Sequence, residues 1–110
     1  MRKLLALTAA TAATAALAVP ALAGPKTVKV GDDYFVRSGA RPTVSVSKGR
    51  TVKWVWAGKS AHNVFVTKGP QKFHSRTFAK GTYSHKMTKK GTYTIVCTIH
   101  SGMEMTLKVK

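Results

Sequence analysis

The sequence predicts an all-β fold, a small Greek-key antiparallel β-sandwich. From Gly24 to the C-terminus, nearly every segment alternates Val, Ile, Phe, Tyr, Trp or Thr with polar residues, the period of two expected of half-buried strands. Lys-Gly pairs interrupt this alternation at 48–49, 80–81 and 90–91, where glycine permits the positive φ that tight turns need. No segment after Gly24 shows a helical period, and strands at this spacing are typical of a sandwich.

Eight segments carry the alternation and are predicted as strands. They are residues 27–30, 43–47, 51–56, 63–67, 76–78, 82–88, 92–97 and 105–109. Residues 32–35 and 70–72 lack the alternation and are predicted as loops. Four aromatic residues are assigned to packing in the core: Trp54, Trp56, Tyr93 and Phe65.

Residues 1–23 have the pattern of a signal peptide. Arg2 and Lys3 form a basic start, an uncharged stretch rich in Ala, Leu and Thr follows, and small residues ending at Ala23 fit a cleavage site. A retained membrane anchor is the weaker interpretation, because the apolar run is shorter than the ~20 residues that span a bilayer. We therefore expect residues 24–110 to be one exported domain, periplasmic or secreted, without a stable membrane anchor.

The charge of the chain restricts its partners. There are 19 Lys and Arg residues against 3 Asp and Glu residues, a formal net charge of +16, and loss of Arg2 and Lys3 with the leader lowers it to +14. The positive electrostatic field of such a charge favours acidic partners and keeps a domain soluble. The leader and the even scatter of the lysines argue against nucleic acid as the partner. We expect a monomer whose redox protein partners have an acidic docking surface.

The chain has a single cysteine, Cys97, so no intramolecular disulfide can form. By alternation Cys97 shares a strand face with Tyr93 and Ile95, and a lone cysteine there is ordinarily a small buried apolar residue. His100 follows three residues later, however, and an exported thiol that binds metal is protected because its thiolate is occupied. Together with His62 upstream, this spacing favours metal ligation.

Two imidazoles, one thiolate and one thioether are available for a single site. The predicted ligands are His62, Cys97, His100 and Met103. This set suits one copper ion in both oxidation states, because soft sulfur favours Cu(I) while imidazole tolerates both. His74 and His85 have no partner at ligand spacing and are assigned structural or solvated roles.

The thioether has two candidates, Met103 and Met105. Met105 shares a strand face with Leu107 and Val109, so packing already explains it. Met103 directly follows Gly102 in the turn and has no such packing role. Met103 is therefore the predicted axial ligand, with Met105 as the alternative.

These segments resemble the plastocyanin and amicyanin branch of the cupredoxins, type 1 blue copper proteins. An early histidine, His62, is followed by a strand, and the other ligands lie on one short loop that begins at Cys97. The likeness covers roughly residues 27–110. It implies a cupredoxin-like fold, a type 1 copper ion, a buried position for His62, and an exposed ring edge of His100 as the route for electrons.

Asn63 follows His62, and Thr98 follows Cys97. The two look like the polar neighbours that pin ligand loops together. A turn asparagine and a strand threonine are an equally good interpretation.

The predicted function is transfer of single electrons between redox partners by Cu(II)/Cu(I) cycling. The chain is not expected to be an enzyme, because the site lacks an open coordination position and the sequence has no His-x-His pair for further coppers. The alternative is a copper carrier or scavenger without an electron-transfer role. Such carriers tend to use Met- or His-rich clusters, and Met103 with Met105 is only a weak sign of one.

Overall fold

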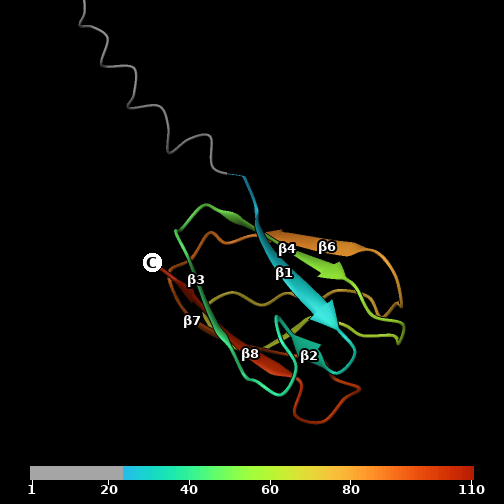
Figure 1. Cartoon of the computed structure of the whole chain (residues 1–110). Helices are drawn as coiled ribbons and strands as arrows, with labels where there is room; N and C mark the ends of the chain where they lie inside the picture. Colours follow the sequence, from blue (N-terminus) through green and yellow to red (C-terminus); the bar gives the residue numbers. More distant parts are fainter. Residues whose placement is uncertain (1–23) are drawn as a thin grey trace, which may run out of the picture.

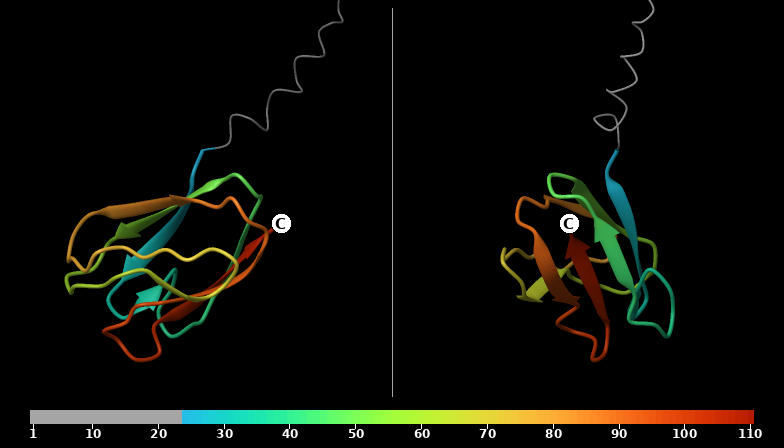
Figure 2. Two further views of the ribbon diagram at one scale, coloured as in Figure 1. Left: turned by 180° about the vertical axis from the view of Figure 1, so that it is seen from behind. Right: turned by 90° about the vertical axis from the view of Figure 1, so that its left-hand side faces the viewer.

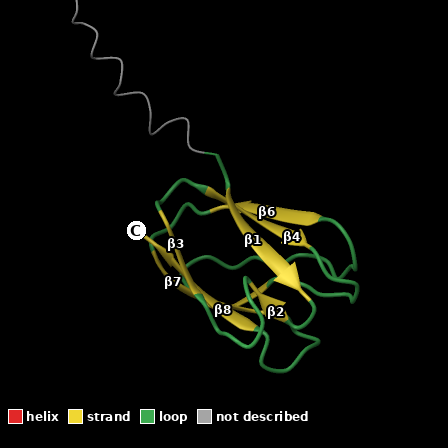
Figure 3. Ribbon diagram, viewed as in Figure 1, coloured by secondary structure: helices red, strands yellow, loops and turns green. Residues whose placement is uncertain are grey.

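A computed structural model describes residues 24–110, which form a β-sandwich of two four-stranded sheets (Figure 1). The strands are β1 (Lys26–Gly31), β2 (Tyr34–Phe35), β3 (Thr43–Val46), β4 (Thr51–Trp56), β5 (Phe65–Lys68), β6 (Thr82–Lys86), β7 (Gly91–Val96) and β8 (Glu104–Val109). Loops and turns join them (Figure 3). In this part of the chain there is no helix long and apolar enough to cross a membrane. The predicted leader lies outside the described residues.

Seven of the predicted strands form, with ends within two residues of those expected. Residues 76–78 do not form a strand, because Phe78 makes only an isolated bridge with His62. β2 lies in a stretch that was predicted as loop. A strand of two residues is too short to show alternation, so the sequence pattern could not reveal it.

The two sheets have the strand orders β2-β1-β4-β6 and β3-β8-β7-β5, and Figure 2 shows them as two layers. From β3 to β7 the chain changes sheet at every step, which confirms the predicted sandwich. β1 pairs with β4, and β3 with β8, in parallel, so both sheets are mixed rather than purely antiparallel. Alternation shows which side chains face inward but not the direction of the neighbouring strand.

The core lies between the sheets and contains Trp54, Trp56 and Tyr93, as predicted. Phe65, the fourth aromatic residue expected there, is 37% exposed. Val66 follows it and is buried; because successive residues of a strand point to opposite faces, Phe65 points outward. Its ring lies 5.7 Å from the ring of His74, between centroids.

His85 on β6 stacks on Phe73, with ring centroids 4.0 Å apart and planes 15° from parallel. Its Nε2 atom is buried without a hydrogen-bond partner in the described structure, and desolvation lowers the pKa of the imidazole below its ordinary 6.5. The folded protein therefore favours neutral His85. The contribution of this residue to stability is present above pH 6.5 and is lost as the pH falls below it.

The substitution His85→Phe is expected to weaken the acid sensitivity of folding, because phenylalanine keeps the stack and cannot be protonated. Urea unfolding of the metal-free protein at pH 7 and pH 5 should show a smaller loss of unfolding free energy in the variant than in wild type. His74→Gln, a change at an exposed histidine, is the control and should behave as wild type. Equal losses in His85→Phe and wild type would contradict the assignment.

Candidate metal centre

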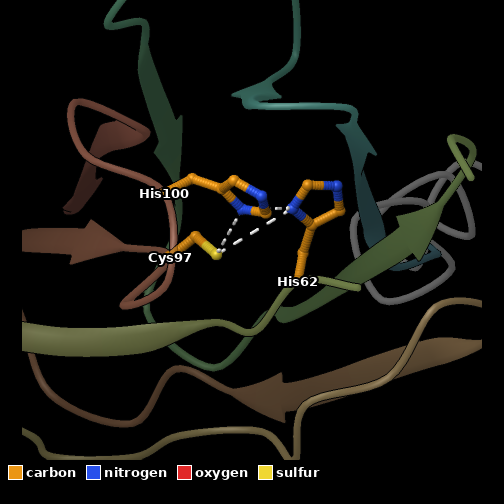
Figure 4. A group of neighbouring side chains, drawn as sticks. All are labelled: His62, Cys97 and His100. Atoms are coloured by element: carbon orange, nitrogen blue, oxygen red, sulfur yellow. Dashed lines mark hydrogen bonds between the residues drawn. The ribbon is translucent and has the colours of Figure 1, made fainter. Parts of the chain in front are cut away.

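The side chains of His62, Cys97 and His100 converge, as predicted, and Figure 4 shows both rings turned toward the sulfur. Cys97 Sγ lies 3.5 Å from His100 Nδ1 and 3.9 Å from His62 Nδ1. The two Nδ1 atoms are 3.1 Å apart. Three donor atoms thus surround a space of the size that one metal ion occupies.

Cys97 is positioned by β7, which ends one residue before it. Its side chain continues the buried face formed by Tyr93 and Ile95, as the alternation predicted, and it is 3% exposed. The strand therefore delivers the sulfur to the core side of the sheet, where water has little access.

The loop from Cys97 to Met103 is closed by its own backbone. The Cys97 N–H donates to the Met103 carbonyl at 3.0 Å, and the Met103 N–H donates to the His100 carbonyl at 3.2 Å. Gly102 has a φ of 82°, a left-handed conformation that glycine adopts without steric cost. The turn holds His100 and Met103 close to the cysteine.

His62 reaches the same place from the connection between β4 and β5. It exchanges two backbone hydrogen bonds with Phe78, at 3.0 and 3.2 Å, and the Trp56 indole N–H donates to its carbonyl at 3.3 Å. Its side chain is fully buried, as the resemblance implied. The backbone of this ligand is thus fixed on both sides.

Asn63 and Thr98 tie the two ligand segments together. The Asn63 side-chain amide donates to Thr98 Oγ1 at 2.9 Å, and the Thr98 backbone N–H donates to Asn63 Oδ1 at 2.8 Å. Of the two interpretations that the sequence left open, the structure supports the one in which Asn63 and Thr98 pin the two loops together.

Two carboxylates at the site were not predicted from the sequence. Asp32 and Asp33 form the turn between β1 and β2. Asp32 Oδ1 lies 3.1 Å from His62 Nε2, and Asp33 Oδ1 lies 3.2 Å from His100 Nε2. Since the whole chain has only 3 acidic residues, an adjacent pair of them was the available signal.

Asp32 is anchored by the backbone. Its carboxylate accepts hydrogen bonds from the N–H groups of Lys59 and Ser60, at 2.9 to 3.0 Å. The bonds from Ser60 and Lys59, followed by the one from His62, lower the pKa of Asp32 to about 2. Asp32 is therefore ionised at neutral pH and offers His62 a fixed acceptor.

The aspartates favour one position of the proton on each histidine ring. A neutral imidazole has one N–H, and a carboxylate acceptor at Nε2 places that proton on Nε2 in both His62 and His100. Both Nδ1 atoms then present lone pairs to each other and to the Cys97 sulfur. The three donor atoms thus point into one space, and two imidazoles with one thiolate fit copper.

Both candidate thioethers are buried, Met103 at 2% exposure and Met105 fully. Met105 pairs with Ile95 across β7 and β8, and with Leu107 and Val109 it forms the buried face of β8, as predicted. Met103 lies before β8, within the loop described above. Its side chain also belongs to the buried core, so the expectation that it has no packing role was wrong. His74 and His85 are not part of the cluster.

A family model for copper-binding proteins, the plastocyanin/azurin family, matches residues 28–110. Among curated proteins no match was found. Many solved structures are similar to this chain. One is the Cu(I) form of an amicyanin variant, with 26% sequence identity and a TM-score of 0.68 over 84% of this chain and 89% of that chain.

Two further structures share the fold. A purple cupredoxin from Nitrosopumilus maritimus has 18% identity and a TM-score of 0.66, covering 77% of this chain and 99% of that chain. A Cu-containing nitrite reductase from Thermus scotoductus SA-01 has 23% identity and a TM-score of 0.68 over 78% of this chain. The match spans only 22% of the reductase.

Proposed function

Since this chain belongs to the plastocyanin/azurin family of copper-binding proteins, with copper as its cofactor, we propose that it is a blue copper protein that carries single electrons between redox proteins. The convergence of the Cys97 sulfur with the Nδ1 atoms of His62 and His100 is the observation that carries the proposal. Bound copper supplies the one-electron couple Cu(II)/Cu(I).

In this proposal His62, Cys97 and His100 would hold the metal, and the thioether of Met103 would be the weak fourth donor. Two observations support Met103 over Met105. The backbone of Met103 is hydrogen bonded to both Cys97 and His100, whereas Met105 lies within β8, where its backbone is part of the sheet.

His100 is the proposed point of entry and exit for electrons. His62 and Cys97 are almost completely buried, while the His100 side chain is 27% exposed. Ile99, its neighbour, is 52% exposed and adds apolar surface beside the ring. A partner protein can therefore approach the site most closely at this histidine.

The proposal includes no reaction on a substrate. The likeness to the nitrite reductase is at the level of the fold and spans a small part of that chain. The four histidines of this sequence contain no His-x-His pair that could bind further copper ions. We further propose that residues 24–110 act as an exported monomer, in the periplasm or outside the cell.

Electron transfer and copper delivery can be separated by two rates measured on the copper-loaded domain. Fast electron self-exchange, measured by NMR line broadening in mixtures of the two redox forms, together with slow copper loss, would support the shuttle. Rapid transfer of copper to an acceptor apoprotein, with slow self-exchange, would instead identify a copper carrier.

The formal charge of +14 on residues 24–110 is expected to speed the encounter with an acidic partner. Charges separated by more than the Debye length, ~8 Å at physiological salt, are largely screened. Stopped-flow rates of electron transfer with the physiological partner should therefore fall as ionic strength rises. A flat or rising dependence would show that the lysines serve solubility rather than docking.

A further inference from the structure

The turn between β1 and β2 contributes one carboxylate to each histidine of the cluster, although the two carboxylates differ in their surroundings. Asp32 is held by two backbone N–H groups and contacts the fully buried His62. Asp33 is 66% exposed in its side chain and contacts His100, which has its own access to solvent. The bond between Asp33 and His100 is therefore the outermost polar contact of the site.

We propose that Asp33 is a positioning residue that fixes the ring of His100 in the orientation that copper requires. The inference rests on the proposed role of His100 as a copper ligand. Asp33 Oδ1 accepts a hydrogen bond from the Nε2–H group of His100, 3.2 Å away, and so keeps the lone pair of Nδ1 directed at the Cys97 sulfur. The ring is thereby held from its outer edge even when its bond to the metal is weak.

His100 needs such support more than His62 does. It lies in a turn between β7 and β8, and its side chain is only partly covered. Within residues 24–110, the polar contacts of its ring are those to Asp33, His62 and Cys97, so Asp33 is its one polar partner outside the cluster. Without Asp33, rotation about the side-chain bonds would take Nδ1 away from the other donors.

The backbone conformation of Asp33 limits the substitutions that can test its role. Its φ is 71°, in the left-handed region that few residues other than glycine, asparagine and aspartate adopt. The same conformation tells which substitutions test the role without straining the turn.

Asp33→Gly and Asp33→Asn both suit a positive φ and therefore separate the side chain from the backbone. Glycine removes the acceptor. Asparagine removes the charge but retains an oxygen that can accept the hydrogen bond from Nε2–H. Glu104→Gln removes the third carboxylate of the chain, which lies 3.9 Å from Arg41 and contacts neither histidine, and serves as the charge control.

The test is the rate of copper loss to a chelator, measured for the Cu(I) and Cu(II) forms. Asp33→Gly should lose copper faster by about 10- to 100-fold, the usual effect of removing a hydrogen-bond partner of a ligand. Asp33→Asn should stay close to wild type, as should Glu104→Gln. In the metal-free protein, ¹⁵N shifts of the His100 ring should show the Nε2–H form in wild type and a mixture of tautomers in Asp33→Gly.

Copper loss from Asp33→Gly at the wild-type rate would overturn the proposal. So would equal acceleration in Asp33→Gly and Asp33→Asn, because charge rather than the acceptor would then be responsible. A wild-type protein that binds Cu(II) without a blue colour would instead count against the copper site itself. A failure of the proposed function is thus distinct from a failure of the role of Asp33.

Discussion

Replacement of Cys97 by serine is expected to abolish the intense blue absorption of the Cu(II)-loaded domain. The colour of such a site comes from charge transfer between a thiolate sulfur and copper, and a serine oxygen at the same place cannot supply that transition. The Cys97 sulfur is the one thiolate that the chain can provide, and it faces both histidine rings. Visible absorption spectra of the two proteins with one equivalent of Cu(II) are the measurement.

The control is Ser101→Ala, which alters an exposed residue of the same loop and should leave the colour intact. Thermal unfolding of the metal-free proteins should show that Cys97→Ser still folds, so that loss of colour reports on the site. A Cys97→Ser protein that remains blue would show that the site has been assigned wrongly.

Replacement of Met103 by leucine is expected to raise the reduction potential and to alter the pattern of absorption bands. Loss of a weak axial thioether leaves Cu(II) with fewer donors and so favours Cu(I). Met105→Leu is the matched control, because both methionines are almost fully buried and both changes nearly conserve side-chain volume. Each should therefore cost less than about 1.5 kcal/mol of stability.

Cyclic voltammetry and visible spectra of the two leucine variants decide between the methionines. A potential that moves in Met105→Leu and not in Met103→Leu would transfer the axial role to Met105. Unchanged potentials in both variants would show that neither thioether is close enough to copper to matter.

The strands and the cysteine end of the site could be predicted because the relevant residues are close in sequence. β4 was predicted with its correct ends, since Val52, Trp54 and Trp56 alternate with half-buried neighbours. Cys97 and His100 are three residues apart, so a single turn brings them together. His62 required an argument from ligand chemistry, because the contact that places it beside Cys97 joins residues 35 positions apart.

The carboxylates could not be predicted in this way. Asp32 is 30 residues from His62, and no spacing rule connects a turn at one sheet edge with a histidine between strands of different sheets. The prediction that Phe65 packs in the core was wrong for another reason. Both faces of its strand carry apolar residues, so alternation could not tell which face was buried, and the structure buries Val64 and Val66.

The pair Asn63 and Thr98 joins parts of the chain 35 residues apart, and none of the groups in its two hydrogen bonds is a metal donor. The spacing of the ligand segments is therefore set by the polypeptide, whichever charge the metal carries. In the proposed role as an electron carrier, few nuclei would therefore have to move when an electron arrives or leaves, and rearrangement would contribute little to the activation energy. A small rearrangement cost would speed both uptake and release of the electron, while the potentials of the two partners would set the direction of transfer.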